Sequence, residues 1–143
     1  MNIVGVWELV SFHVELGGES TSPFGPEPFG RILYDSSGWM SAVLMKTPRS
    51  SAGASLESAR HSTSEDKAQA FDEYLSYTGR WRVEDLDGET TVVHEVDASL
   101  VPSVIGTALR RRATLDGDTL TLDYENRSRS GKERRFILRW RRP

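Results

Sequence analysis

A histidine and an arginine stand on otherwise apolar faces of two segments that are predicted to be neighbouring strands. Alternation within residues 92–100 places His94 on the same face as valines, an alanine and a leucine. In residues 109–115, Arg111 shares its face with two leucines and an alanine. A buried guanidinium needs a carboxylate, a carbonyl, water or an anionic ligand as its partner. An imidazole in the same wall could transfer protons.

His94 and Arg111 are therefore the candidate catalytic residues, with the imidazole as general acid or base and the guanidinium stabilising an oxyanion. The alternative is a pair of interior polar side chains that only satisfy each other's hydrogen bonds. Six other side chains are expected to face inward and contact a ligand, the tyrosines through their hydroxyl groups. They are Tyr34, Trp39, Ser41, Tyr77, Trp81 and Tyr124.

Other kinds of chemistry find little support in the sequence. The chain has no cysteine, and its three histidines, at positions 13, 61 and 94, lack the spacing of a metal site. It has no Gly-x-Ser-x-Gly elbow, phosphate loop or dinucleotide fingerprint. We expect neither a metal nor a cofactor.

Charge and hydropathy also restrict the partners. The net charge of −3 and the pI of about 5.6 argue against nucleic acid as the partner. No apolar run is long enough to span a membrane, and the N-terminus does not resemble a signal peptide, so we expect a cytoplasmic protein. Residues 1–109 hold 7 Lys and Arg against 16 Asp and Glu, whereas residues 110–143 hold 11 against 5. This asymmetry indicates either a basic face that binds anions or, the interpretation we favour, pairing of outer charges between the two halves of one barrel.

Recurring turn signals between short runs of β-branched and aromatic residues predict successive hairpins within one domain, residues 1–143. About eight strands are expected, enough to close an antiparallel all-β barrel around one small ligand. One helix is predicted at residues 64–76, where apolar residues recur at helical spacing after a Ser62 or Thr63 cap. Residues 46–63 are either a mobile loop that could act as a lid or a slack connector.

The chain resembles the lipocalin-like domain family of small calycin-type barrels. The resemblance rests on residues 5–12 (GVWELVSF), 23–30 (PFGPEPFG), 33–34 (LY), 38–42 (GWMSA), 77–81 (YTGRW), 93–96 (VHEV), 99–102 (SLVP) and 115–122 (LDGDTLTL), with Gly106 and Arg111. It implies the closed barrel, in which an arginine of the last strand, Arg139 or Arg141, packs on the face of Trp7. Because some members of this family act in natural-product pathways, the resemblance permits a cyclase or isomerase role.

We expect a small-molecule-binding barrel that is a cofactor-independent cyclase, isomerase or lyase acting on a hydrophobic, oxygenated, polyketide-like metabolite. The alternative is a non-catalytic carrier or sensor of a small hydrophobic ligand, in which Arg111 pairs with a ligand anion. A homodimer is possible, although no sequence feature selects one.

Overall fold

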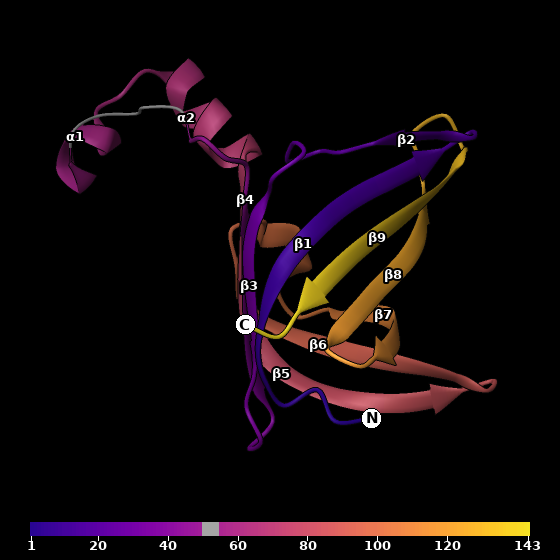
Figure 1. Cartoon of the computed structure of the whole chain (residues 1–143). Helices are drawn as coiled ribbons and strands as arrows, with labels where there is room; N and C mark the ends of the chain where they lie inside the picture. The colour runs from indigo at the N-terminus through magenta and orange to yellow at the C-terminus, as the bar shows by residue number, and fades with distance from the viewer. Residues whose placement is uncertain (50–54) are drawn as a thin grey trace.

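One antiparallel sheet closes on itself to form a barrel, as Figure 1 shows. The fold is that of a computed structural model, described for residues 1–49 and 55–143. The barrel strands are β1 (Gly5–Leu16), β3 (Phe29–Tyr34), β4 (Trp39–Met45), β5 (Tyr74–Leu86), β6 (Glu89–Ser99), β7 (Ala108–Asp116), β8 (Thr119–Arg127) and β9 (Glu133–Arg141). Each strand pairs with the next in this order, and β1 closes the barrel against β9. The short strand β2 (Glu19–Thr21) extends the end of β1 as a hairpin, and a 3-10 turn, η1 (Pro102–Val104), precedes β7. The predicted eight-stranded antiparallel barrel is confirmed.

The predicted helix is present but shorter than expected. Helix α2 (Ser64–Asp72) begins after Thr63, whose side chain accepts the backbone N–H of Asp66 at 3.1 Å. The prediction was wrong for residues 73–76, because Tyr74 already starts β5 and pairs with Met45 of β4. The helical spacing of apolar residues continues to Leu75, but the helix ends earlier because the backbone of β5 already pairs with β4.

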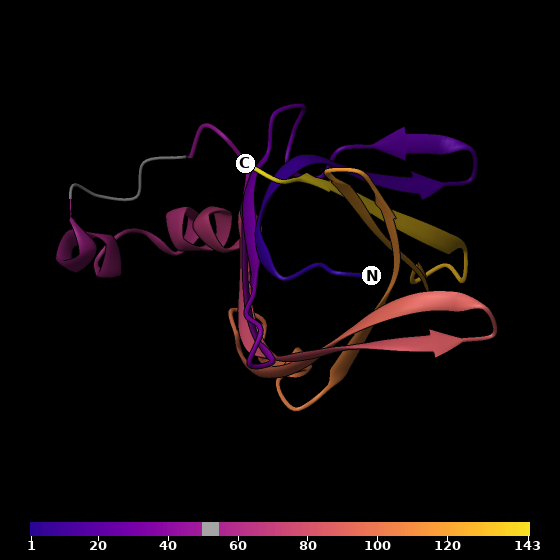
Figure 2. The same cartoon turned by 60° about the horizontal axis from the view of Figure 1, so that its bottom comes forward.

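A second helix, α1 (Leu56–Arg60), forms within the segment 46–63 that was expected to lack regular structure. Both helices extend beyond the ends of β4 and β5, to one side of the barrel (Figures 1 and 2). Part of the suggested lid, residues 50–54, lies outside the described residues. Neither described helix has the length or apolar character needed to cross a membrane.

The N-terminal segment closes one end of the barrel. It crosses the end that is turned forward in Figure 2, and Ile3 is fully buried there. The indole Nε1–H of Trp7 donates to the carbonyl of Ile3 at 2.9 Å. The Arg142 guanidinium lies 4.2 Å from the centre of the Trp7 ring and donates to the carbonyls of Asn2 and Val4. The packing arginine was expected at position 139 or 141, and this was wrong, because the contact comes from the residue that follows β9.

The outer charges pair mainly within each half of the chain, which corrects the expectation that the two halves pair with each other. Of the ion pairs in the described ranges, only Arg110 with Glu84 joins the two halves, at 3.8 Å. Within the arginine-rich third, Arg112 and Arg135 instead pair with Asp123 and Glu125, on the outer face of β7, β8 and β9.

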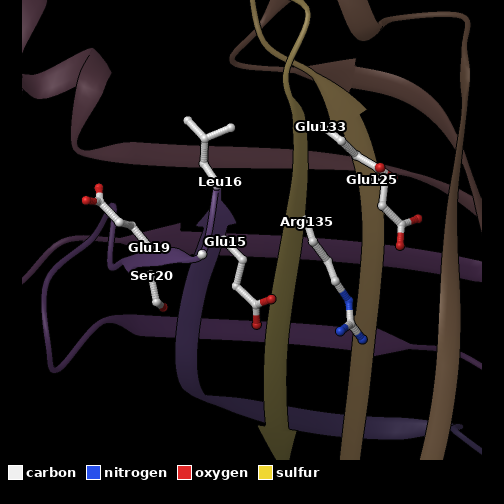
Figure 3. Close-up of a pocket in the computed structure, with 9 residues that line it drawn as sticks. Glu15, Leu16, Glu19, Ser20, Glu125, Glu133 and Arg135 are labelled. Atoms are coloured by element: carbon white, nitrogen blue, oxygen red, sulfur yellow. The ribbon is translucent and has the colours of Figure 1, made fainter.

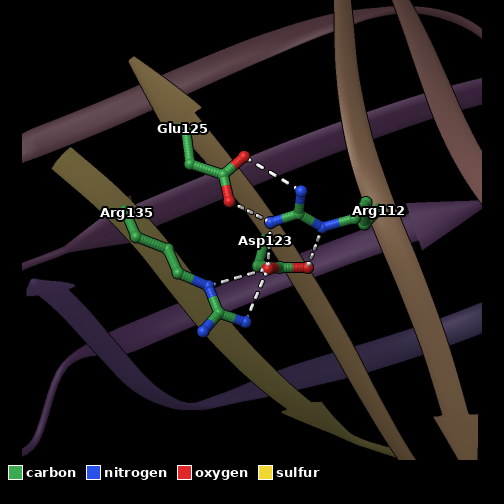
Figure 4. A network of polar contacts seen from close by, with 4 residues as sticks. All are labelled: Arg112, Asp123, Glu125 and Arg135. Atoms are coloured by element: carbon green, nitrogen blue, oxygen red, sulfur yellow. Dashed lines mark hydrogen bonds and ion pairs between the residues drawn. The ribbon is translucent and has the colours of Figure 1, made fainter. Parts of the chain in front are cut away.

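Figure 4 shows this local network around Asp123, a buried carboxylate. Asp123 accepts hydrogen bonds from Arg112 at 2.7 Å and from Arg135 at 2.8 Å, while Arg112 also contacts Glu125. Burial alone would raise the pKa of Asp123, but the hydrogen bonds from the two arginines outweigh it and hold the pKa below its usual value. Arg112 thus has anionic partners on the outer face, whereas the side chain of the preceding residue, Arg111, points inward.

Candidate ligand-binding site

A small cavity lies inside the barrel. Its apolar walls contain four polar side chains, and its lining is Phe12, Ile32, Ala42, Leu44, Leu75, Tyr77, His94, Arg111, Leu122, Tyr124, Leu138 and Trp140. Its volume of about 50 Å³ is enough for a few water molecules. Typical sites for drug-sized ligands are several times larger, roughly 300 Å³ or more. A larger ligand therefore requires some of the lining side chains to move.

The lining falls into a deep half and a half that is accessible to solvent. The deep half is buried and consists of Ile32, Ala42, Leu44, His94, Leu122 and Trp140. The other half is partly exposed and consists of Phe12, Leu75, Tyr77, Arg111, Tyr124 and Leu138. Because the N-terminal segment closes the opposite end, we infer that a ligand enters past these partly exposed side chains.

His94 lies between two tyrosines, with both ring nitrogens hydrogen-bonded. The Tyr34 hydroxyl is 2.8 Å from Nε2, and the Tyr77 hydroxyl is 2.9 Å from Nδ1. These side chains come from β3, β5 and β6, and each stands on the inward face of its strand. Tyr34 and His94 are each 1% exposed. His94 and Tyr77 line the cavity, whereas Tyr34 does not.

Hydrogen-bond satisfaction assigns a direction to this chain of three groups. A neutral imidazole donates from one nitrogen and accepts at the other. If Nε2 carried the proton, the hydroxyl hydrogen of Tyr34 would be buried with no acceptor in the described structure. With the proton on Nδ1, Tyr34 donates to Nε2 and Nδ1–H donates to the Tyr77 oxygen. The Tyr77 O–H is then free to donate to an acceptor in the cavity.

All three groups are held in their neutral forms. Burial, reinforced by the nearby charge of Arg111, lowers the pKa of His94 to about 3. Burial also raises the pKa of Tyr77 to about 12 and raises that of Tyr34 well above its usual value. At neutral pH the chain therefore carries no charge, and it presents one hydroxyl donor to the cavity.

Arg111 supplies the positive charge of the site. Its guanidinium carbon lies 3.6 Å from the centre of the Tyr124 ring, and Nη1 donates to the carbonyl of Arg110 at 3.1 Å. Arg111 takes part in none of the ion pairs among the described residues. Its partners are thus an aromatic face and a backbone carbonyl rather than a carboxylate.

Several of the residues predicted from the sequence meet at this cavity. His94, Arg111, Tyr77 and Tyr124 line it, and Tyr34 lies directly behind His94. Trp81 packs against Tyr34 with ring centres 5.0 Å apart, and its Nε1–H donates to the carbonyl of Asp35. Trp81 therefore supports the site from behind and does not line it.

Trp39 and Ser41 do not face the cavity, so their expected inward orientation was wrong. In β4, the residues that point inward are Met40, Ala42 and Leu44, and these are buried. Trp39 is 50% exposed, with the Arg80 guanidinium 4.4 Å from the centre of its ring. Ser41 lines a shallow groove outside the barrel, of about 370 Å³. Both faces of β4 carry apolar residues, so alternation alone could not identify the inner one.

Sequence reasoning did not identify Trp140 as a site residue. Trp140 lines the cavity and is 1% exposed, and its Nε1–H has no hydrogen-bond partner within residues 1–49 and 55–143. A buried tryptophan N–H usually finds an acceptor. No sequence pattern indicates that this N–H lacks an acceptor, because that depends on which residues surround the ring in the folded barrel.

An open groove of about 480 Å³ lies outside the barrel, beside the turn between β1 and β2. Figure 3 shows it between Glu15 and Glu19 on one side and Glu125, Glu133 and Arg135 on the other. It contains none of the predicted site residues. Throughout residues 1–49 and 55–143, no three His, Asp or Glu side chains are grouped in a way that could hold a metal ion.

Comparison with known proteins agrees with this architecture. The profile of the lipocalin-like domain matches residues 4–143. The chain is also 38% identical over 84 residues to the 4'-hydroxy-3'-methoxypropiophenone carrier protein ppsC of Aspergillus oryzae, an alignment that covers 55% of this chain and 76% of that protein. The barrel, its closed end and this match over nearly the whole chain lead to one conclusion: the protein belongs to the lipocalin-like domain family.

Proposed function

We propose that this protein is a carrier that holds a small, hydrophobic, oxygenated metabolite inside its barrel without transforming it. The observation that carries the proposal is the hydrogen-bonded chain from Tyr34 through His94 to Tyr77, whose last hydroxyl group lies at an apolar cavity. An apolar pocket with a few placed polar groups is the usual design of a small-molecule site.

The relative supports the same class of ligand. Its name assigns it an aryl ketone that also bears a hydroxyl and a methoxy group. Such a molecule combines an aromatic ring, which suits walls formed by Phe12, Tyr124 and Trp140, with oxygen acceptors for the Tyr77 hydroxyl. We propose that this protein binds an aromatic ketone or a molecule of similar shape and polarity.

The enzyme hypothesis is the weaker of the two. It required His94 to exchange protons near neutral pH, but a general base works best when its pKa lies near the working pH. With a pKa of about 3, the His94 imidazole is a weak base, and two tyrosine hydroxyls occupy both of its nitrogens. This environment suits an oriented hydrogen-bond relay better than a proton-transfer catalyst.

The cytoplasmic location and the homodimer stay predictions.

Equilibrium binding of 4'-hydroxy-3'-methoxypropiophenone to Tyr77→Phe tests the proposal. Loss of the hydroxyl should weaken binding about 3- to 10-fold, the usual range for one hydrogen bond. Tyr74→Phe is the matched control, because Tyr74 starts the same strand but does not line the cavity, and the Arg49 guanidinium lies 5.2 Å from its ring centre. This control should bind like the wild type.

Chromatography of the ligand after prolonged incubation separates a carrier from an enzyme. We expect the ketone to be recovered unchanged. Conversion of the ketone, with loss of turnover in His94→Gln, would favour the enzyme instead. Absence of saturable binding, or equal affinities of Tyr77→Phe and the wild type, would contradict the proposed site.

A further inference from the structure

Arg111 is a cation that faces an apolar cavity without a carboxylate partner. The lining contains no Asp or Glu, and the ion pairs among the described residues do not include Arg111. The neighbouring arginines on β7, Arg110 and Arg112, both reach carboxylates on the outer face. Of these three consecutive arginines, only the inward one therefore lacks an anionic partner in the part of the chain that the structure describes.

The charge of Arg111 influences the ionisable groups around the cavity. These groups are Tyr34 on β3, Tyr77 on β5, His94 on β6 and Tyr124 on β8. Burial is the largest influence on the pKa of each, and for each the charge of Arg111 favours the deprotonated form. None of the three tyrosines supplies the missing anion, because burial keeps their pKa values above the usual range. The same charge would act on an acidic group of a bound ligand.

Further donors accompany this cation. The Tyr77 hydroxyl lines the cavity, and the buried Nε1–H of Trp140 has no acceptor among the described residues. The Tyr124 ring on which Arg111 lies is stacked on Phe136, with ring centres 4.6 Å apart and 1° between the planes. A second guanidinium, that of Arg134, lies 5.5 Å from the centre of the Phe136 ring. The cavity lining thus holds the Arg111 guanidinium, the Tyr77 hydroxyl and the Trp140 Nε1–H, with no acidic side chain to neutralise the positive charge.

We propose that the cavity binds an acidic phenol, such as a hydroxyaryl ketone, as its phenolate, with Arg111 as the counter-ion. This inference rests on the proposed carrier function and specifies the charge state of its ligand. A phenolate offers a full negative charge to the guanidinium, while its ring remains compatible with the apolar walls. In a site of low polarity this attraction is much stronger than it would be in water.

Two probes of nearly equal shape test this inference. 4-Hydroxyacetophenone can ionise, whereas its methyl ether, 4-methoxyacetophenone, cannot. The phenolate absorbance of the first probe is titrated with pH, free and in the presence of saturating protein, and calorimetry gives the dissociation constant of each probe above and below the phenol's pKa. We expect the pKa of the bound phenol to be at least one unit below its free value, which corresponds to at least tenfold tighter binding of the phenolate than of the phenol.

Arg111→Met should abolish this shift, whereas Arg110→Met should retain it. The two variants remove the same charge from adjacent residues of β7, but Arg110 points outward to Glu84. Since the shift is measured first in the wild type, the test does not depend on the folding of either variant.

Each outcome has a separate meaning. A bound phenol that titrates at or above its free pKa, or a methyl ether that binds as tightly as the phenolate, would overturn the phenolate inference and leave the carrier function intact. A shift that survives in a folded Arg111→Met would overturn the role of Arg111. If neither probe nor 4'-hydroxy-3'-methoxypropiophenone bound, the proposed function would fail, and this inference with it.

Discussion

At the scale of single residues, the hydrogen-bonded chain inside the barrel depends on His94, which its surroundings hold in the neutral form. Removing His94 from water disfavours its charged form, and the cation of Arg111 adds to this effect. The two tyrosines then use both ring nitrogens without requiring a charge. Rigid orientation of the Tyr77 hydroxyl, rather than proton transfer, is the property that this arrangement provides.

The low pKa of His94 predicts how stability changes with pH. The imidazole binds a proton more tightly in the unfolded chain, where its pKa is about 6.5, than in the folded protein, where its pKa is about 3. The free energy of unfolding should therefore fall as the pH drops below about 6.5, and His94 should contribute a loss of about 2 kcal/mol between pH 7 and pH 5.

Urea unfolding of the wild type and His94→Gln at both pH values measures this loss. The glutamine amide can donate to one tyrosine and accept from the other, and it does not titrate. The variant should therefore lose about 2 kcal/mol less than the wild type over this interval. Parallel losses in the two proteins would show that His94 is not held neutral.

Alternation along the strands predicted the inward direction of His94 and Arg111, because each stands in a face whose other members are apolar. The same reasoning failed for Trp39, since β4 is apolar on both faces and only barrel closure decides which one is buried. The hydrogen bonds of His94 were also beyond sequence reasoning. They join residues 60 and 17 positions apart, and the positions of those residues around the barrel depend on the strand register.

At the scale of elements, a bulge between β5 and β6 sets the relation between Tyr77 and His94. The register changes between Thr78 and Gly79, so that Tyr77 lies opposite Ser99 while Trp81 lies opposite His94. Gly79 allows the backbones to approach closely, because a Cβ at this position would lie 1.8 Å from the carbonyl oxygen of Glu95. Glycine within a strand commonly marks such a close approach.

Gly79→Ala should therefore be strongly destabilising. We expect a loss of about 3 kcal/mol in the free energy of unfolding, together with weaker ligand binding, because the strands must separate beside the site. Gly131→Ala serves as the control. Gly131 has a φ of +82°, but a Cβ added there would meet no described atom within 4 Å beyond its chain neighbours, so this variant should lose about 1 to 2 kcal/mol from backbone strain alone and bind ligand normally. Equal losses and equal affinities in the two variants would contradict this role for the bulge.

Most of the elements could be predicted from the sequence because turn residues separate alternating runs. The helix was predicted too long, since Leu75 continues the helical spacing and yet lines the cavity from β5. Long-range pairing with β4 decides this boundary, and no local pattern contains that information. The position of the packing arginine, 142 rather than 139 or 141, likewise depends on how the chain leaves β9.

At the scale of the whole molecule, the barrel is closed at one end and partly accessible at the other. The N-terminal segment, Trp7 and Arg142 close the first end, while partly exposed side chains such as Phe12 and Tyr124 border the cavity. A volume of about 50 Å³ is too small for an aryl ketone, so binding must widen the accessible half. His94 in the buried half, and Tyr34 behind it, are expected to keep their hydrogen bonds.

A structure of the protein with 4'-hydroxy-3'-methoxypropiophenone tests the central claim most directly. We predict one ligand inside the barrel, with an oxygen atom within hydrogen-bond distance of the Tyr77 hydroxyl and with Phe12 or Tyr124 displaced to make room. A ligand seated in the outer groove beside Glu15 and Glu19, or an interior ligand that leaves the Tyr77 hydroxyl without contact, would contradict the account.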